Sequence, residues 1–456
     1  MLKKAAITST NTIVKLYLNI ISSIAFYPTF ISVGLFLLSL LTLYTDQRTP
    51  DELLGRAIDI KNVLAPDSVR TLLGTIAGGM ISLMVFSFSM VMVVLNQTSS
   101  SYSPRLLPTL VKKKHHQIVM GFYIGTIAYS FMVLSSIESL MYTFQVPSLS
   151  VIVNVLLSII CLALFISFIN RISQDIQIGN IINELYQATV KGIEYEIEHE
   201  VYVPDSELPD MAQWSAVKSL ISGYLDTIDD KRLIRTAKNM DVVLKICIPI
   251  GQFVNRKDVL LLSSRQLSET EQQKLFETMI FRHQENISEN YLYGFKQLSE
   301  VAIKALSPGI NDPGTALQAL DRLTDLFVLR TSVYGLKIKV DDANGLRLIY
   351  QPAHFSLLIY YCMSTIMNYA DKAVPVYSKL IQMFSALLQN DEYERYTDNI
   401  MALVNDLLIH INNKLTTLHD RQVLNEQIRK LVVAYPEHQL AQAMVLTIRQ
   451  SSSSEK

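Results

Sequence analysis

The chain has 456 residues with a formal net charge of −1 at pH 7, and 18% of them are charged, against about 25% in ordinary soluble domains. The shortage is local, because residues 1–170 contain 11 Lys/Arg and 6 Asp/Glu, whereas residues 171–456 contain 29 and 35. An apolar, mildly basic third followed by an acidic two-thirds excludes a single soluble domain, and the acidic part has the wrong sign to bind the phosphate backbone of nucleic acid.

Residues 1–170 contain four segments that are long and apolar enough to cross a membrane, and we predict that they form a transmembrane domain. The hydrocarbon core of a bilayer is about 30 Å thick and needs about 20 apolar residues in a helix. We place the spans near residues 24–44, 72–95, 117–137 and 149–170. The lipid bilayer is therefore the first partner that the sequence predicts.

Basic residues in the loops indicate the orientation of these spans. The N-terminus carries Lys3, Lys4 and Lys15, and the loop between the second and third spans carries Arg105 and a run of three lysines that ends at Lys114. The loop between the third and fourth spans has no Lys or Arg, and the first loop is mixed, with four Lys/Arg among acidic residues. Since loops rich in Lys and Arg stay in the cytoplasm, we predict a multi-pass protein of the inner (cytoplasmic) membrane with both termini in the cytoplasm.

The second span combines small and polar residues in a regular pattern. Its small residues, which let another helix approach closely, are Gly74, Gly78 and Gly79. Its polar residues recur every seven positions and so lie roughly along one face; they are Thr75, Ser82, Ser89 and Asn96. Because a polar stripe in a bilayer must face protein or water, the stripe either forms a helix–helix seam or lines a polar pathway between copies of the helix.

Residues 171–210 are expected to be a connecting helix and an acidic linker. Helical spacing continues past the fourth span, so the last helix is expected to extend into the cytoplasm. Farther on, acidic and apolar residues alternate between Glu194 and Val201, which is typical of a strand, although the same residues also fit a continuation of the helix. Pro204 and Pro209 then mark a break.

Residues 211–265 are expected to form a small β-rich module that resembles a barrel or a sandwich. Asp229 and Asp230 are suited to cap a short helix within it. The strands are predicted at residues 214–218, 224–228, 242–250 and 259–262, and the short helix at residues 231–240.

Residues 266–450 are expected to form a helical cytoplasmic domain. The fold class is therefore a membrane domain of four helices followed by an α+β, mostly helical domain. Asn344-Gly345 is a strong hairpin signal, and strands are predicted on either side of it, so that the hairpin covers residues 336–350. Helices are predicted at residues 269–284, 289–306, 313–333, 353–369, 375–388, 393–418, 421–433 and 438–448. Residues 451–456 are expected to be a disordered tail.

The segment Ser307-Pro308-Gly309-Ile310-Asn311-Asp312-Pro313-Gly314 separates two of these helices. Asp312 suits the N-cap of the second helix, and Pro313 suits its first position. The segment is either a rigid corner between two helices, or a binding or assembly loop in which Ser307, Asn311 and Asp312 face a ligand or a neighbouring subunit.

Two runs of residues carry a resemblance to a known family. One is Ser103-Pro104-Arg105-Leu106, and the other is Ala305-Leu306-Ser307-Pro308-Gly309-Ile310-Asn311-Asp312-Pro313. They make the chain similar to the bacterial predicted-membrane-protein family catalogued as domain of unknown function 2254. The resemblance covers most of the chain and implies an integral membrane protein, without implying a particular activity.

Motifs of known enzymes are absent from the sequence. It contains no phosphate-binding P-loop, dinucleotide-binding, HExxH or GxSxG motif, and its three cysteines lie far apart, without the spacing of a zinc site. We therefore favour a protein that is not an enzyme, and predict neither a cofactor nor a metal site.

Two hypotheses of function follow. The first is an oligomeric channel or transport-type protein, in which the polar stripe lines a pathway and the cytoplasmic domain assembles or gates a homo-oligomer. The cytoplasmic mouth of that pathway would carry Ser103, Arg105, Lys112, Lys113 and Lys114. The alternative is a membrane-anchored sensor or scaffold, whose cytoplasmic domain binds a ligand or a protein partner.

Overall fold

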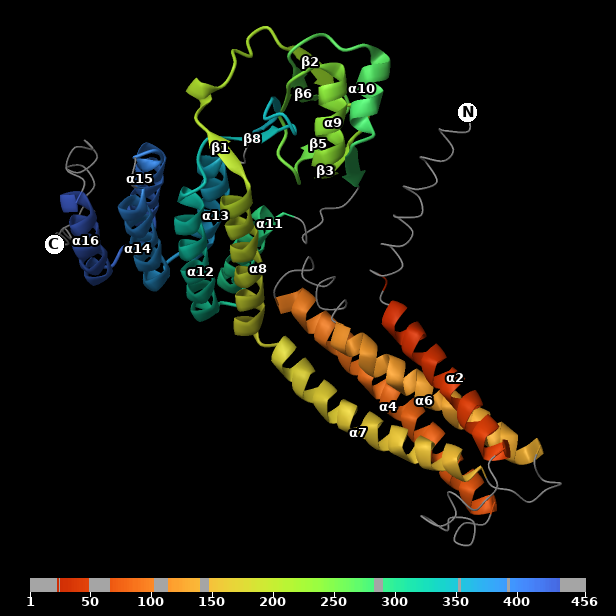
Figure 1. The fold of residues 1–456 in the computed structure, drawn as a ribbon. Coiled ribbons are helices and arrows are strands. Elements are labelled where there is room, and N and C mark those ends of the chain that lie inside the picture. Colours follow the sequence, from red (N-terminus) through yellow and green to blue (C-terminus); the bar gives the residue numbers. More distant parts are fainter. Residues whose placement is uncertain are drawn as a thin grey trace, which may run out of the picture. The chain divides into compact units, whose positions relative to one another are not determined.

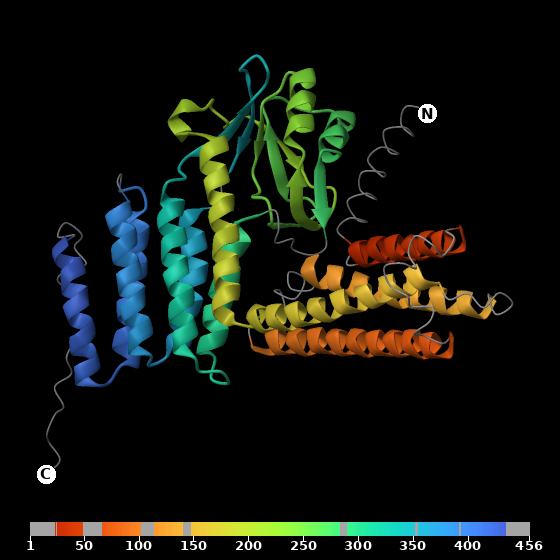
Figure 2. The same ribbon diagram turned by 60° about the horizontal axis from the view of Figure 1, so that its bottom comes forward.

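The computed structural model describes residues 23, 25–48, 66–101, 114–139, 147–282, 290–351, 354–391 and 394–434. The chain divides into two compact units, Met1–Gln177 and Ile178–Lys456. The first is called the membrane unit here and the second the C-terminal unit, and each is described by itself (Figure 1, Figure 2).

The membrane unit contains four long apolar helices, as the sequence predicts. They are α2 (Phe26–Arg48), α4 (Pro66–Ser101), α6 (Lys114–Ser139) and α7 (Ser148–Asp175). Helix α6 packs against the other three. Its contact with α2 is close because a Cβ atom built on Gly125 would lie only 2.6 Å from Cδ1 of Leu35, so a glycine there allows the two helices to meet.

Polar groups join the helices of the membrane unit at one end. The carboxylate of Asp46, on α2, accepts hydrogen bonds from the backbone N–H groups of Leu149 and Ser150, each at 3.0 Å, and from Oγ of Ser150 at 2.6 Å. The N-cap of α7 is Pro147, which has no capping side chain. Asp46 therefore caps α7 from another helix, where a negative charge also interacts favourably with the helix dipole.

The helix predicted beyond the fourth span is present, with one interruption. Helix α7 ends at Asp175, and α8 (Ile178–His199) begins two residues after Ile176. The acidic alternation between Glu194 and Val201, which fits either a strand or a helix, is helical as far as His199. A short strand, β1 (Val201–Val203), follows.

The strands of the C-terminal unit form two open sheets in the described part of the chain, so of the predicted barrel-like or sandwich-like module the barrel is not confirmed. The six-stranded sheet has the order β1, β8 (Leu336–Val340), β9 (Leu346–Tyr350), β4 (Leu244–Ile246), β6 (Val259–Ser263) and β2 (Ser215–Lys218). The three-stranded sheet has the order β5 (Phe253–Val254), β3 (Gly223–Ile228) and β7 (Met279–Arg282). The hairpin around Asn344-Gly345 forms as predicted, but β9 pairs in parallel with β4. Strands distant in sequence thus extend the sheet instead of allowing it to close.

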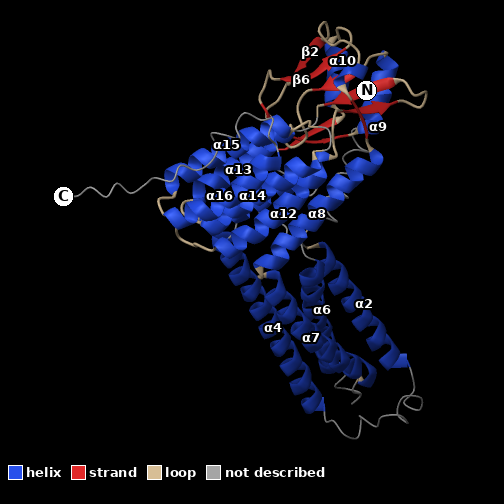
Figure 3. Ribbon diagram, turned by 90° about the vertical axis from the view of Figure 1, so that its left-hand side faces the viewer, coloured by secondary structure: helices blue, strands red, loops and turns tan. Residues whose placement is uncertain are grey.

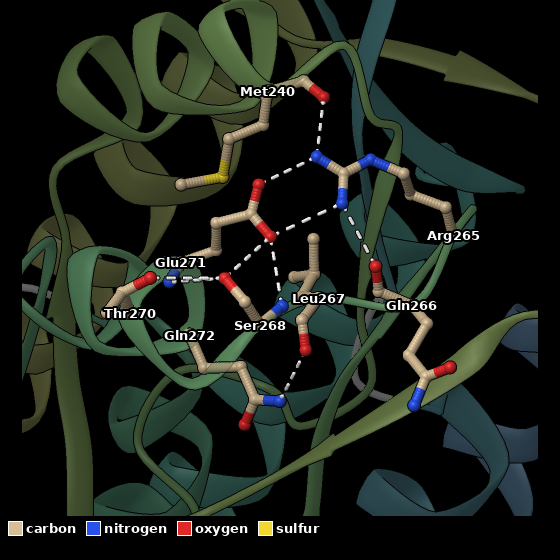
Figure 4. Close-up of polar contacts among 8 residues, drawn as sticks. All are labelled: Met240, Arg265, Gln266, Leu267, Ser268, Thr270, Glu271 and Gln272. Atoms are coloured by element: carbon tan, nitrogen blue, oxygen red, sulfur yellow. Dashed lines mark hydrogen bonds and ion pairs between the residues drawn. The ribbon is translucent and has the colours of Figure 1, made fainter.

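Two short helices, α9 (Asp230–Met240) and α10 (Glu269–Phe276), share a hydrophobic core with these strands. Ser268 and Glu271 form a capping box at the start of α10, and Arg265 holds the Glu271 carboxylate at 2.7 Å (Figure 4). These contacts lower the pKa of Glu271 to about 2. The prediction of one helix over residues 269–284 is wrong, because the chain leaves α10 and pairs with β3 as strand β7.

The remaining helices form a two-layer array. One layer contains α8, α12 (Pro313–Thr331), α14 (Val374–Asn390) and α16 (Leu418–Ala434); the other contains α11 (Leu292–Leu306), α13 (Phe355–Ala370) and α15 (Thr397–Lys414). Figure 3 separates this array from the sheets by colour. The helices predicted here from the sequence are present, whereas the predicted helix at 438–448 and the tail at 451–456 lie outside the described residues.

Candidate functional site

Helix α4 has a packed face and an exposed face. Its packed face contacts α6 and α7 through residues that are each at most 5% exposed; they are Val69, Leu73, Ala77, Met80, Ser87 and Val94. The four positions of the predicted polar stripe are exposed; they are Thr75, Ser82, Ser89 and Asn96. The packed residues are mostly apolar, whereas the polar stripe faces away from the rest of the described membrane unit.

The three glycines of α4 lie on exposed positions as well. A Cβ atom built on Gly74, Gly78 or Gly79 would have no neighbour within 4 Å. The described helices of the same chain therefore do not use the close approach that these glycines permit. This differs from Gly121 and Gly125 of α6, where such an atom would lie 3.0 Å and 2.6 Å from side-chain atoms of α2.

Hydroxyl groups in the stripe bond to the backbone of their own helix. Oγ1 of Thr75 donates to the carbonyl of Thr71 at 2.7 Å, and Oγ of Ser82 donates to the carbonyl of Gly78 at 3.0 Å. The hydroxyl protons are satisfied without a partner helix, while each hydroxyl oxygen keeps lone pairs that can accept a further bond. The stripe can thus present acceptor oxygens to water, to a solute or to another helix.

Most of the predicted cytoplasmic mouth lies outside the described residues. This applies to Ser103, Arg105, Lys112 and Lys113. Lys114 is the first residue of α6 and is exposed. Its ammonium lies 5.9 Å from the ring centroid of Tyr27, in the first turn of α2. The structure therefore places one residue of this set at the end of a spanning helix.

A histidine and an aspartate that sequence reasoning did not connect meet in the membrane unit. Nε2 of His116 lies 3.1 Å from Oδ2 of Asp175, and the two side chains are 11% and 12% exposed. The ring of Phe168 packs edge-on against the His116 ring, with centroids 5.4 Å apart. Because the two residues are 59 positions apart, no local pattern pairs them. The contact ties the first turn of α6 to the last turn of α7.

The corner between α11 and α12 is built largely by its own hydrogen bonds. The carboxylate of Asp312 accepts from the Thr315 N–H at 3.1 Å and from its hydroxyl at 2.6 Å, and these bonds lower the pKa of Asp312. Oγ of Ser307 donates to the carbonyl of Lys304 at 2.6 Å. Asn311 has a positive φ of 50° and, like Ile310, is exposed. Of the three predicted residues, Ser307 and Asp312 shape the corner, and Asn311 faces outward.

A buried arginine in the C-terminal unit is a second feature that the sequence does not reveal. Arg330 is 2% exposed, and its Nη1 donates to the carbonyl of Val333 at 2.7 Å. Glu196 of α8 and the phenols of Tyr202 and Tyr291 interact electrostatically with it. Burial raises the pKa of both tyrosines, so the phenols are neutral. The cluster brings together side chains from α8, β1, the N-cap of α11 and the last turn of α12.

The comparisons with known proteins agree with the four apolar helices. The family model described as "Predicted membrane protein (DUF2254)" matches residues 21–386. The chain belongs to this family. The four apolar helices of this DUF2254 protein are thus those of a membrane protein. The description of the family names no activity, substrate or partner.

The comparisons with similar proteins and with solved structures identify no functional site. This DUF2254 protein is 25% identical to an uncharacterized protein of Mycobacterium bovis and to one of Mycobacterium tuberculosis, each over 71% of this chain and 64% of the relative. The chain thus spans less than two thirds of the length of these relatives. No solved structure matches it. Among the residues that the structure describes, no group of three or more His, Cys, Asp or Glu side chains could hold a metal ion.

Proposed function

We propose that copies of this membrane protein associate through the exposed face of α4 and that the polar stripe lines a path for polar solutes between them. The protein would then act as an oligomeric channel or transport-type protein. The C-terminal unit would assemble the oligomer or gate the path. The observation that carries this function is that the stripe and the glycines of α4 are exposed and unused by the described helices of the same chain, whereas its packed face is mostly apolar. Large apolar residues such as Val85 and Phe86 are exposed beside the stripe.

The physical support comes from the solvent that surrounds a spanning helix. Lipid tails offer no hydrogen bonds, so polar residues in spanning segments normally face protein or a water-filled cavity. Asn96 in particular has an amide side chain with both donors and acceptors. Glycines four residues apart let a second helix approach the backbone closely. A second copy of α4 meets both requirements, because it brings the same small and polar residues.

The orientation belongs to the same proposal. The loop between the second and third spans has four Lys/Arg and the loop between the third and fourth has none, which favours an inner-membrane protein with both termini in the cytoplasm. The loop between the first and second spans also has four Lys/Arg, mixed with acidic residues. Arg105 and the lysines up to Lys114 would then surround the cytoplasmic end of the path, where a ring of positive charge attracts anions.

A membrane-anchored sensor or scaffold is the second candidate. It is favoured by the corner between α11 and α12, where Ile310 is 38% exposed and Asn311 is exposed next to it. In this case the spans serve as an anchor, and the corner contacts a cytoplasmic ligand or partner. A change to the α4 stripe would abolish the flux through a channel, but would leave the function of a sensor or scaffold intact.

The test is solute flux through the purified full chain in liposomes. We expect ion flux from the unaltered protein and its loss in the double variant Ser82→Leu with Ser89→Leu. The matched control places leucine one position earlier, as Ile81→Leu with Phe88→Leu. Those residues are 39% and 57% exposed and point about 100° away around the helix, so flux is expected to persist. If assembled, unaltered protein conducts nothing under any ionic or voltage condition, or if the serine variant conducts normally, there is no such path.

A further inference from the structure

Helix α13 presents an exposed face whose composition is unusual for a surface in water. Its 16 residues, Phe355–Ala370, include no Asp, Glu, Lys or Arg. The buried side contains Ile359, Met363 and Ile366, each 0% exposed. The opposite side carries large side chains that remain uncovered; they are Leu357 (51% exposed), Tyr360 (45%), Tyr361 (68%) and Tyr369 (44%).

These side chains form one continuous stripe, called the α13 stripe here. Leu357, Tyr361, the half-buried Thr365 and Tyr369 follow one another four positions apart, so each lies next to the one before it on the helix surface. The rings of Tyr360 and Tyr361 meet edge to face, with centroids 5.7 Å apart. Helix α15 packs beside α13 and adds Ile409, which is 53% exposed.

The other layer of the array has an ordinary surface. The exposed positions of its helices include many charged residues, among them Glu184, Lys191, Asp321, Arg322, Glu426 and Lys430. The two layers belong to the same unit and have the same kind of core. The neighbours of α13 in its own layer also expose charged residues, such as Lys296 on α11 and Asp406 on α15. The absence of charge is therefore a property of α13 alone.

We propose that the α13 stripe binds the same stripe of a second copy of this chain. Because the stripe itself contains no charged residue, it can meet its own image without opposing like charges, which a two-fold contact would otherwise bring together. Tyrosine is enriched and charged residues are depleted at the centres of protein interfaces. An anionic lipid surface fits poorly, since α13 has no Lys or Arg with which to contact headgroups.

Attachment to the membrane makes such a contact easier to form. Copies of a membrane protein share one plane, so a contact in either unit raises the effective concentration of the other unit's surfaces. A small, uncharged patch is then sufficient, although it would be weak between freely diffusing domains. The contact through α13 does not require the path along α4, and either one can exist without the other.

Charge placed on the stripe tests this contact. Two differently tagged copies of the full chain are co-expressed, and their co-purification is measured in mild detergent. Tyr361 lies near the middle of the stripe, so it is close to the axis of a two-fold contact. With Tyr361→Glu in both copies we expect association about tenfold weaker, because like charges oppose each other. Tyr361→Lys in one copy with Tyr361→Glu in the other is expected to restore association.

Tyr195 provides the matched control, because it is 60% exposed and lies on α8 in the other layer. Tyr195→Glu in both copies is expected to leave association unchanged. If Tyr361→Glu has no larger effect than Tyr195→Glu, or if the Lys and Glu copies associate no better than two Glu copies, the α13 stripe contributes nothing to association, which counts against the proposal.

Cross-linking in membranes gives a second measurement, which stays informative if α4 alone holds the copies together. Tyr361→Cys is treated with a bis-maleimide, and Tyr195→Cys and the unaltered chain are treated in parallel. The unaltered chain measures the background from the native Cys161, Cys247 and Cys362, of which only Cys247 is not buried. We expect a product of two chains for Tyr361→Cys well above both controls. Equal yields, or a product with a different protein, would overturn the proposal.

Discussion

Helix α4 exposes some polar residues where lipid is expected around it. Helix α13 exposes large apolar and aromatic residues although it belongs to the C-terminal unit. Helix α4 is expected to be surrounded by lipid, and beside exposed apolar residues such as Val85 and Val93 it exposes glycines, hydroxyl groups and Asn96. Helix α13 belongs to the C-terminal unit, yet it exposes Leu357 and three tyrosines. In both helices the opposite face packs into the core of its own unit in the ordinary way. The comparison identifies, on each helix, the exposed residues that the two proposals assign to contacts with neighbouring copies.

The largest effect on stability is expected from the packed face of α13. Ile359 is 0% exposed, so Ile359→Ala removes buried methyl groups and leaves a cavity, which costs about 2–5 kcal/mol in the free energy of unfolding. Denaturant unfolding of the full chain in detergent measures it. Leu357→Ala, on the exposed stripe, is the matched control. Equal losses for the two variants would mean that the stripe is part of the core, and the contrast between the two faces would disappear.

Substitutions of two glycines in the membrane unit distinguish contacts within one chain from contacts between chains. A Cβ atom at Gly125 would lie 2.6 Å from Leu35, so Gly125→Ala is expected to cost about 1–3 kcal/mol by overpacking. Gly78→Leu has open space around it and is expected to preserve the folded chain but to weaken its association. Thermal unfolding and particle mass, measured on the same samples, distinguish the two outcomes. Normal assembly of a chain that carries both Gly78→Leu and Tyr361→Glu, the second of which removes the α13 contact, would exclude α4 from the contact.

A smaller effect is expected at the corner between α11 and α12. Asp312→Ala removes the N-cap of α12 and should cost about 1 kcal/mol. Because hydrogen bonds from Thr315 lower the pKa of Asp312, its contribution is complete above the ordinary carboxyl pKa and is lost as the pH falls below it. The stability difference between Asp312→Ala and the unaltered chain should therefore shrink in acid. A difference that is constant with pH would contradict the capping role.

The smallest effect on stability is expected on the stripe itself. Leu357→Ser replaces an exposed apolar residue, and the free energy of unfolding of a single copy should change by no more than about 0.5 kcal/mol. The same variant should reduce co-purification of two copies. A large loss of stability together with normal association would contradict this prediction, because Leu357 would then belong to the core and not to a contact between copies.

Local sequence patterns predict the spanning helices and the hairpin. They do not predict which strands pair when those strands are far apart in the sequence. The spans follow from apolar length, and the hairpin at Asn344-Gly345 follows from turn chemistry. The parallel pairing of β9 with β4 joins residues about a hundred positions apart, so it leaves no periodic signal. Residues Met279–Arg282 were predicted as helix because they continue the pattern of α10, and pairing with β3 decides their structure.

Candidate site residues show the same division. The period of seven in α4 placed Thr75 and Ser82 on one face, and the structure shows that this face is exposed. The contact of His116 with Asp175 depends on two helices meeting, and the sequence contains no signal for it. In α13, the lack of charge is visible in the sequence, but an uncharged helix of 16 residues also fits a fully buried position. Only the exposure of its tyrosines indicates a surface.

The most direct test of the central claim is the structure of the full chain as a particle in nanodiscs. We predict a symmetric particle of more than one copy, with Ser82 and Tyr361 both covered by neighbouring copies. A monomer whose α4 stripe faces lipid and whose α13 stripe faces water would contradict the account.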